Sequence, residues 1–485
     1  MNVSIGRALA VLADEDPERV AVRVDDVTLT RRELDLDTNR LARSWAHRVG
    51  QDDLVTVALP SGLDLVRACC AVWKLGATPQ PLSPSIDAAE RQQVLELARP
   101  ALVVDGPIAE VSDDDSPLPD RVASSWKAPT SSGSTGRPKI VRATAPARVD
   151  PHGRIAEFVP REAVQLVAAP LWHAAPFVYA MRGLMTGHEV VVMAEFDPGR
   201  WLELVAEHRV TWGMLVPEMM RRIHQLGPER LAEADLSSLD SVLHLGARCA
   251  PWLKEAWIDL LGPDRVVEVY AGTEAQGLAM ITGREWLEHP GSVGRGCGGS
   301  QFRVVRDDGT DCEPGETGEI VMRRETPTYE YLGAEMTTRD GWHTLGDSGH
   351  LDEDGFLYVG DRLSDVIVTD GVMVQPADVE QVLDAHPDVQ GSVVVPRDDD
   401  VLGQVVHAVV QTTASVDELD VWVATRLPAH QRPHEWTLVT ERLRGDTGKV
   451  RRSDWRSVSG PLEPVRRPRK VVDSSESLLR APEGM

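Results

Sequence analysis

The sequence predicts an α/β protein with a separate, compact α+β domain in its C-terminal part. Three observations lead to this fold class. The chain has 485 residues, and a single core rarely grows beyond about 300 residues, so we expect two or more domains. Short β-rich runs alternate with amphipathic stretches over residues 20–100, which is typical of layered α/β structure. After Gly315 the pattern changes to short strands and tight turns.

The N-terminal elements follow from hydrophobic periodicity. Apolar residues at helical spacing predict helices over residues 31–49 and 63–76. Residues 106–129 are acidic, contain prolines and show little periodicity, so we expect a surface loop there. β-Branched apolar runs predict strands beginning at Val20, Leu54, Ala163, Glu189, Asp240 and Arg265.

The C-terminal part reads as hairpins followed by a small α+β unit. Acidic turns at 307–309 and 352–355 fit β-hairpins. After Pro376 a helix (ADVEQVLDAH) and two strands (GSVVVP and VVHAVVQ) make a unit of about 100 residues. The composition of residues 461–485, rich in Pro and Arg and then in Ser and Glu, predicts a disordered tail.

Composition argues against two classes of partner. Lys and Arg number 51 against 76 Asp and Glu, a formal net charge of -25. Such a surface repels nucleic acid and anionic lipid, so we expect neither a nucleic-acid nor a membrane partner. The five cysteines show no metal-ligand or disulfide pattern, which predicts free thiols. With no signal peptide and no long apolar run visible, we expect a cytoplasmic protein.

The run SSGSTGRPK, residues 131–139, carries the clearest chemistry. Its glycines allow positive φ and let backbone N–H groups turn inward, while its hydroxyls and lysine add donors and charge. It is not a Walker loop, because Pro138 and Ile140 flank the lysine. The run therefore predicts a polyphosphate cradle made by Ser131, Ser132, Gly133, Ser134, Thr135, Gly136 and Lys139.

This run resembles the phosphate-binding signature of the adenylate-forming (AMP-forming) ligase superfamily, which includes acyl-CoA synthetases and stand-alone amide synthetases. Three other stretches are similar to the family's signatures in the same order: YAGTE (270–274), residues 341–380 and GDTGKVRR (445–452). The resemblance implies ATP and Mg²⁺ as cofactors. It implies a large N-terminal domain over 1–361, of layered α/β subdomains, and a mobile lid domain over 362–460.

The resemblance also implies roles for single residues in nucleotide binding. Tyr270 would stack on adenine, Thr273 would contact the α-phosphate, and Glu274 would hold the metal. An aromatic face suits a purine, and a carboxylate suits a hard cation. Asp347 matches the acid that binds the ribose hydroxyls, and Arg362 matches an arginine that contacts ribose or phosphate.

Two further residues match catalytic positions of the family. Lys449 would reach both the substrate carboxylate and the α-phosphate and stabilise the charge that develops between them. His173 stands where relatives place an aromatic residue or histidine between the acid and the phosphate loop, although it could also be a packed core histidine. Ser364 falls at the hinge between the domains.

Residues 253–274 and 285–296 are most similar to ligases for bulky acids, such as the bile-acid CoA ligase group. The resemblance implies a bulky or aromatic carboxylic acid as the substrate. The residues expected to line its pocket are His173, Phe177, Gly246, Ala247, Ala271 and Gly272.

The acceptor of the acyl group stays open between CoA and a small amine. Asp370 and Met373 stand in a loop that borders the pantetheine tunnel of CoA ligases, where a carboxylate and a bulky thioether would hinder CoA. Asp370 could hold an amine there, or it could be an ordinary turn residue. The chain shows no carrier domain, so any carrier acts in trans.

Rival readings fit less well. A catalytically inactive family member would lack the lysine or the acids, yet Lys139, Glu274 and Lys449 are present. GRGCGG (294–299) satisfies a dinucleotide-binding GxGxxG, but a β-rich run follows it instead of a helix. GDSGH (346–350) has histidine where a serine hydrolase motif needs glycine.

Overall fold

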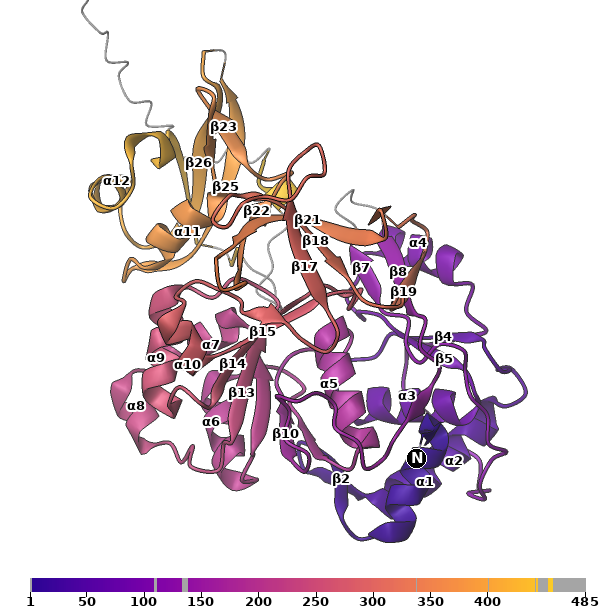
Figure 1. Ribbon diagram of the computed structural model, residues 1–485. Coiled ribbons are helices and arrows are strands. Elements are labelled where there is room, and N and C mark those ends of the chain that lie inside the picture. Colours follow the sequence, from indigo (N-terminus) through magenta and orange to yellow (C-terminus); the bar gives the residue numbers. More distant parts are fainter. Residues whose placement is uncertain are drawn as a thin grey trace, which may run out of the picture. The chain divides into compact units, whose positions relative to one another are not determined.

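The computed structural model describes residues 2–108, 111–132, 138–336, 338–399, 401–440, 442–443 and 452–456 (Figure 1). By their mutual contacts, the described residues up to Ser364 form one compact unit and those from Asp365 form a second, smaller one. Both contain helices and strands. The predicted α/β class, with a large N-terminal and a small C-terminal domain, is therefore confirmed.

The largest sheet of the first unit has nine strands within the described residues. The six strands from β14 to β2 run parallel, and the remaining three are antiparallel to their neighbours. The strands occur in the order β16 (Arg295–Gly296), β15 (Leu278–Thr282), β14 (Val266–Ala271), β13 (Ser241–Leu245), β12 (Trp212–Leu215), β10 (Val164–Val167), β11 (Glu189–Val192), β2 (Val20–Val24) and β3 (Val27–Thr30).

Smaller sheets complete this unit. A parallel sheet holds β5 (Thr78–Pro81), β4 (Leu54–Val57) and β6 (Leu102–Val104), and an antiparallel sheet holds β19 (Tyr329–Leu332), β8 (Pro138–Ala143) and β7 (Thr130–Ser132). Another antiparallel sheet holds β17 (Gln301–Val305), β18 (Gly318–Arg323), β21 (Trp342–Leu351) and β20 (Thr338–Arg339), with β22 (Leu357–Arg362) on β21. The short pair is β1 (Val3–Ser4) and β9 (Arg148–Val149).

The helices of the first unit cover these sheets. Trp73 and Phe177 are buried in one large core, and Trp201, Trp212 and Trp257 in another. The helices are α1 (Ile5–Glu15), α2 (Arg31–Trp45), α3 (Leu63–Lys74), α4 (Ala88–Ala98), α5 (Ala174–Met185), α6 (Pro198–Glu207), α7 (Pro217–His224), α8 (Pro228–Glu233), α9 (Pro251–Leu261) and α10 (Gly283–Glu288).

The predicted loop at 106–129 is only half correct. Its described residues contain no helix or strand, as expected. Its end is nevertheless buried, because Trp126 stacks on Phe177 with ring centroids 6.3 Å apart and its carbonyl accepts a hydrogen bond from the Trp73 indole. Apolar burial of a large aromatic side chain outweighs the polar composition of the segment before it.

The second unit is a small α+β fold. Its sheet has the order β24 (Val372–Val374), β23 (Ile367–Thr369), β26 (Gly403–Thr412) and β25 (Val389–Asp399), and β27 (Glu435–Val439) runs parallel to β26. Helices α11 (Pro376–Asp384) and α12 (Val416–Ala424) complete it, with short 3₁₀ turns at Ala429–Gln431 and Arg452–Asp454. Val379, Leu383 and Leu419 from the two helices join its core.

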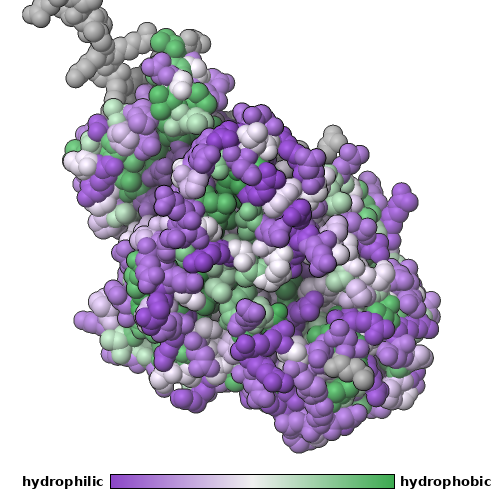
Figure 2. Space-filling view, in the orientation of Figure 1, coloured by the Kyte–Doolittle hydropathy of each residue, from purple (hydrophilic) through white to green (hydrophobic). Residues whose placement is uncertain are grey.

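Hydrophilic residues cover much of the face seen in Figure 2. Among the described helices, none combines the length and the apolar character that crossing a bilayer requires. All five cysteines are free thiols, as predicted, and Cys69 and Cys70 are buried.

Candidate functional site

The site begins where β14 ends. Ligands of open sheets of this type bind beyond the carboxyl ends of the parallel strands. After Ala271 the chain turns sharply: the Ala275 N–H donates to the Gly272 carbonyl at 3.0 Å, and Ala275 has a φ of +53°. This left-handed conformation costs an alanine about 1 kcal/mol. The turn places Thr273, partly buried, and Glu274, fully buried, just past the strand end.

Glu274 is the centre of a polar cluster. Lys139 Nζ lies 3.0 Å from Glu274 Oε1, and the Tyr331 hydroxyl donates to the same oxygen at 2.5 Å. The Lys139 ammonium also donates to the Tyr331 hydroxyl at 2.8 Å and lies 4.0 Å from the centre of its ring. The Thr328 hydroxyl donates to the Glu274 backbone carbonyl at 2.9 Å. Sequence reasoning predicted Lys139 and Glu274, and the structure brings them into contact.

This cluster keeps Glu274 ionised. Burial by itself raises the pKa of Glu274, but the Tyr331 hydrogen bond and the Lys139 charge outweigh it, and the pKa lies below its ordinary value. Burial and the bond to Glu274 raise the pKa of Tyr331, so its proton stays in place. The result is a buried carboxylate between a cation and a neutral donor, a suitable ligand for a hard cation.

Gly272 stands at a close approach of two side chains. A Cβ at this position would lie 2.8 Å from Glu274 Oε2 and 2.8 Å from Leu345 Cδ1. Oε2 therefore faces a position without a side chain, whereas Lys139 and Tyr331 contact Oε1. The predicted pocket residue Ala271, next to it, is exposed.

The predicted adenosine residues form a second cluster at the same strand end. The Tyr270 hydroxyl donates to Asp347 Oδ2 at 2.6 Å, and Arg362 Nε lies 3.6 Å from Asp347 Oδ1. Asp347 lies at an irregularity of the β21–β22 pairing, beside Gly346 with a φ of +78°. Burial, and then the Asp347 charge, raise the pKa of Tyr270, which therefore stays neutral.

The phosphate segment lies across two strands. Ser131 and Ser132 belong to β7 and Lys139 to β8, and Ser131 pairs with Lys139 in the antiparallel register. Gly133, Ser134, Thr135 and Gly136 lie outside the described residues. The described flanks pair as antiparallel strands, and Lys139 on the second of them forms an ion pair with Glu274.

The predicted acyl-pocket residues are dispersed. His173 is the N-cap residue of α5, and its ring centroid lies 6.1 Å from that of Trp172. Gly246, exposed and with a φ of +92°, and Ala247 follow β13 at the same sheet edge as Glu274. Phe177 is a correction: it is completely buried between Trp73 and Trp126 and is a core residue here, not part of a pocket wall.

The remaining predictions concern the second unit and its boundary. Ser364 is the last described residue of the first unit and is exposed. Asp370 and Gly371, with φ of +50° and +75°, form the two-residue loop of the β23–β24 hairpin, in which Thr369 pairs with Val372. Two successive positive φ values favour an Asp-Gly loop. The conformation of the turn therefore accounts for an aspartate at position 370. Lys449 lies outside the described residues.

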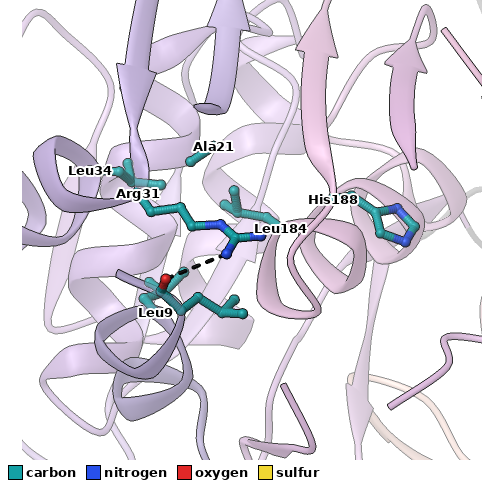
Figure 3. Close-up of a pocket in the computed structure, with 7 residues that line it drawn as sticks. Leu9, Ala21, Arg31, Leu34, Leu184 and His188 are labelled. Carbon is teal, nitrogen blue, oxygen red and sulfur yellow. Dashed lines mark hydrogen bonds between the residues drawn. The ribbon is translucent and has the colours of Figure 1, made fainter. Parts of the chain in front are cut away.

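A small pocket in the N-terminal part of the first unit is lined by none of the predicted site residues (Figure 3). Arg31 donates there to the backbone carbonyls of Leu12, at 3.5 Å, and Gly187, at 2.8 Å. Burial lowers the pKa of His188 to about 4, so its ring is neutral. The pocket is lined by Leu9, Leu12, Ala21, Arg31, Leu34, Leu184 and His188.

Comparison with known proteins gives a consistent match. The family described as AMP-binding enzyme matches residues 9–128 and 127–332, and its C-terminal domain matches residues 378–449. A feruloyl-CoA synthase from Amycolatopsis sp is 30% identical over 94% of this chain and 99% of its own length.

Two solved structures show the same fold. The o-succinylbenzoate CoA synthetase of Bacillus subtilis, in complex with its acyl-adenylate intermediate, has a TM-score of 0.80 and 25% identity, covering 94% of this chain and 99% of its own. The amide bond synthetase McbA of Marinactinospora thermotolerans has a TM-score of 0.78 and 23% identity, covering 93% and 99%.

Proposed function

This chain belongs to the AMP-binding enzyme family, and on that premise we propose that it activates a bulky or aromatic carboxylic acid. It is an AMP-forming ligase. The carboxylate of the acid attacks the α-phosphate of ATP and displaces pyrophosphate, which leaves an acyl-adenylate. The acceptor, CoA or an amine, then attacks the acyl carbon and displaces AMP.

The observation that carries the assignment of this site is the Lys139–Glu274–Tyr331 cluster. It joins the end of the phosphate segment to the turn after β14 and holds a buried, ionised carboxylate there. A lysine and a carboxylate beside each other suit a site that must bind a polyphosphate together with its cation.

ATP and Mg²⁺ fit the residues present. Glu274 would hold the metal through Oε2, the oxygen that faces Gly272, and Lys139 would move from Glu274 to a phosphate oxygen. Bound Mg²⁺ neutralises charge on the phosphates and polarises them for attack. Tyr270, Asp347 and Arg362 would bind the adenosine half, and the family resemblance assigns Lys449 to the reacting carboxylate.

The acid class is supported by the relatives. Feruloyl and o-succinylbenzoyl groups are both aromatic, and the proteins that bear these names match almost the whole chain. His173, Gly246, Ala247 and Gly272 are the residues proposed to line the acid pocket. Phe177 is left out, because it belongs to the core.

CoA is the acceptor that these relatives' names support, and a small amine is the second candidate. The case for an amine depended on Asp370 and Met373. Met373 is exposed, and Asp370 occupies a position that the hairpin turn explains. Neither side chain therefore needs an amine to account for it.

The assay follows both half-reactions with the full chain. Purified enzyme, ATP, Mg²⁺ and a panel of aromatic acids are incubated with CoA, with amines, or with neither, and the products are identified by mass. We expect AMP and a CoA thioester. Amide formed without CoA would identify the amine reaction instead. The Lys449→Ala variant should lose adenylation, and a chain that yields no AMP with any acid would contradict the proposal.

A further inference from the structure

Lys127 differs from every other lysine in the described residues. The chain has six lysines, and four of them lie in the described part. Three pair with a carboxylate: Lys74 with Asp35 at 2.5 Å, Lys139 with Glu274 at 3.0 Å and Lys254 with Glu268 at 2.5 Å. The fourth, Lys127, is only 6% exposed, yet its ammonium makes no hydrogen bond or ion pair with a described residue.

A second cation lies beside it. The Lys127 ammonium lies 5.6 Å from the centre of the Trp126 ring, and the Arg182 guanidinium carbon lies 4.6 Å from the same ring. Arg182, from α5, is partly buried, and its guanidinium likewise makes no hydrogen bond or ion pair with a described residue. One indole thus contacts two cations, and neither cation has a counter-ion among the residues that the structure describes.

This arrangement is unfavourable as it stands. Burial of a charge without a partner is costly, and a second charge of the same sign adds to the cost. Each contact with the ring offsets only part of this cost. Burial, followed by repulsion from Arg182, lowers the pKa of Lys127 to about 8, whereas attraction to Glu274 raises it. That attraction shows that Lys127 lies within electrostatic reach of the Glu274 site.

We propose that Lys127 and Arg182 form an oxyanion-binding subsite beside Trp126, which takes a phosphate or carboxylate group of a small molecule. An anion between the two cations supplies the missing counter-charge, and both side chains donate charge-assisted hydrogen bonds to it. The source of the anion rests on the proposed function: it is either a phosphate of ATP or pyrophosphate, or a second carboxylate on the acid.

The test measures anion binding to the full chain without acid substrate. Inorganic pyrophosphate, phosphate and succinate are titrated into wild type, Lys127→Met, Arg182→Met and Lys127→Arg, and binding is followed by calorimetry and by the shift of the unfolding midpoint. We expect wild type to bind at least one anion. Both Met variants should bind it at least tenfold more weakly, and Lys127→Arg should keep most of the affinity.

The unfolding temperature measured without anion distinguishes an anion-binding role of Lys127 from a structural role. Lys127→Met is expected to unfold at the same temperature as wild type or higher, because it removes a buried unpaired charge. Lys254→Met, the matched control, should unfold at a lower temperature, because it leaves Glu268 buried without its partner. Wild type that binds none of the anions, or Met variants that bind them as wild type does, would overturn the subsite.

The choice of anion identifies the source. Loss of pyrophosphate affinity assigns the subsite to the nucleotide, and loss of succinate affinity assigns it to the acid. A protein that binds pyrophosphate through Lys127 but forms no adenylate contradicts the proposed function and leaves the subsite in place. If the protein forms the adenylate but both Met variants bind the anions as wild type does, the proposed function holds and the subsite is contradicted.

Discussion

Lys139 and Tyr331 lie 192 residues apart in the chain, yet the lysine ammonium donates to the tyrosine hydroxyl at 2.8 Å. The antiparallel pairing of β8 with β19 brings them together, since Leu332 pairs with Ile140 and Tyr331 with Val141. Both side chains then meet on Glu274. Strand pairing thus determines the electrostatics of the proposed metal ligand.

The first prediction concerns the Tyr331 hydroxyl. Tyr331→Phe removes one donor from Glu274 and should lower kcat/KM for ATP in pyrophosphate exchange by about 10- to 100-fold, because hydrogen bonds to charged groups contribute about 1.5–3 kcal/mol. Tyr358→Phe is the control, since its hydroxyl contacts Asp352 instead. Equal rates of pyrophosphate exchange in Tyr331→Phe and Tyr358→Phe would show that the Tyr331 hydroxyl does not contribute to the site.

The second prediction concerns metal affinity. Loss of an outer partner of a metal ligand costs about 10- to 100-fold in affinity, so Glu274→Gln should raise the half-saturating Mg²⁺ concentration at least as much. A magnesium titration of pyrophosphate exchange measures this, with the exposed Glu255→Gln as control. An unchanged titration curve would show that Glu274 is not a ligand.

The third prediction tests the close approach at Gly272. Gly272→Ala adds a Cβ 2.8 Å from both Glu274 Oε2 and Leu345 Cδ1. We expect adenylation to fall about tenfold or more, with a loss of stability of about 1–3 kcal/mol from overpacking. Gly391→Ala, where no atom lies within 4 Å of the added Cβ, should keep wild-type activity. The two variants are compared by pyrophosphate exchange and thermal unfolding.

The fourth prediction is a pH dependence of stability. The pKa of Lys127 is lowered to about 8 in the folded chain from 10.5 when unfolded. Below pH 8 the charge of Lys127 therefore lowers the free energy of unfolding by its full amount. This decrease becomes smaller as the pH rises toward 10.5, because in that range Lys127 is neutral in the folded chain and still protonated in the unfolded chain. In buffers without multivalent anions, Lys127→Met should therefore exceed wild type in stability by about 3 kcal/mol at pH 7. The difference should vanish near pH 10.5. Denaturant titrations at several pH values measure it, and a difference that stays constant with pH would contradict the prediction.

The fifth prediction concerns the β23–β24 hairpin. Asp370→Asn keeps a residue that accepts positive φ and removes only the charge, so stability and acceptor KM should stay close to wild type. Asp370→Val should lower stability by about 1–2 kcal/mol, because a β-branched residue is strained there. A raised KM for an amine acceptor in Asp370→Asn would show that the carboxylate binds the amine after all.

Sequence patterns predicted the elements better than the contacts between them. The strands predicted at Val20, Leu54, Glu189 and Asp240 and the helices predicted at Arg31 and Leu63 appear within one residue of those positions, because their periodicity is local. Motif order also pointed to Lys139 and Glu274, which the structure brings into contact. Tyr331 was missed, because alternating Tyr329 and Tyr331 are typical of any strand, and only pairing with β8 gives the hydroxyl its role.

The other errors have the same origin. Phe177 was assigned to the acid pocket, but the side of α5 that it occupies meets Trp73 and Trp126, which come from segments far away in the sequence. Those contacts also bury the end of a segment whose composition predicted a surface loop. Lys127 gave no signal, because a lysine in such a segment is normally solvated, and its burial depends on the same distant aromatic residues.

Asp347 already uses both carboxylate oxygens inside the protein, one with Tyr270 and one with Arg362. Under the proposed function a sugar hydroxyl that docks there shares each oxygen with an internal partner, because a carboxylate oxygen accepts up to two hydrogen bonds and sharing weakens each of them. The net enthalpy of nucleotide capture should then be smaller than the number of new contacts suggests. Releasing the phenol of Tyr270 from the carboxylate also frees its ring to reorient, which couples recognition of the base to recognition of the sugar.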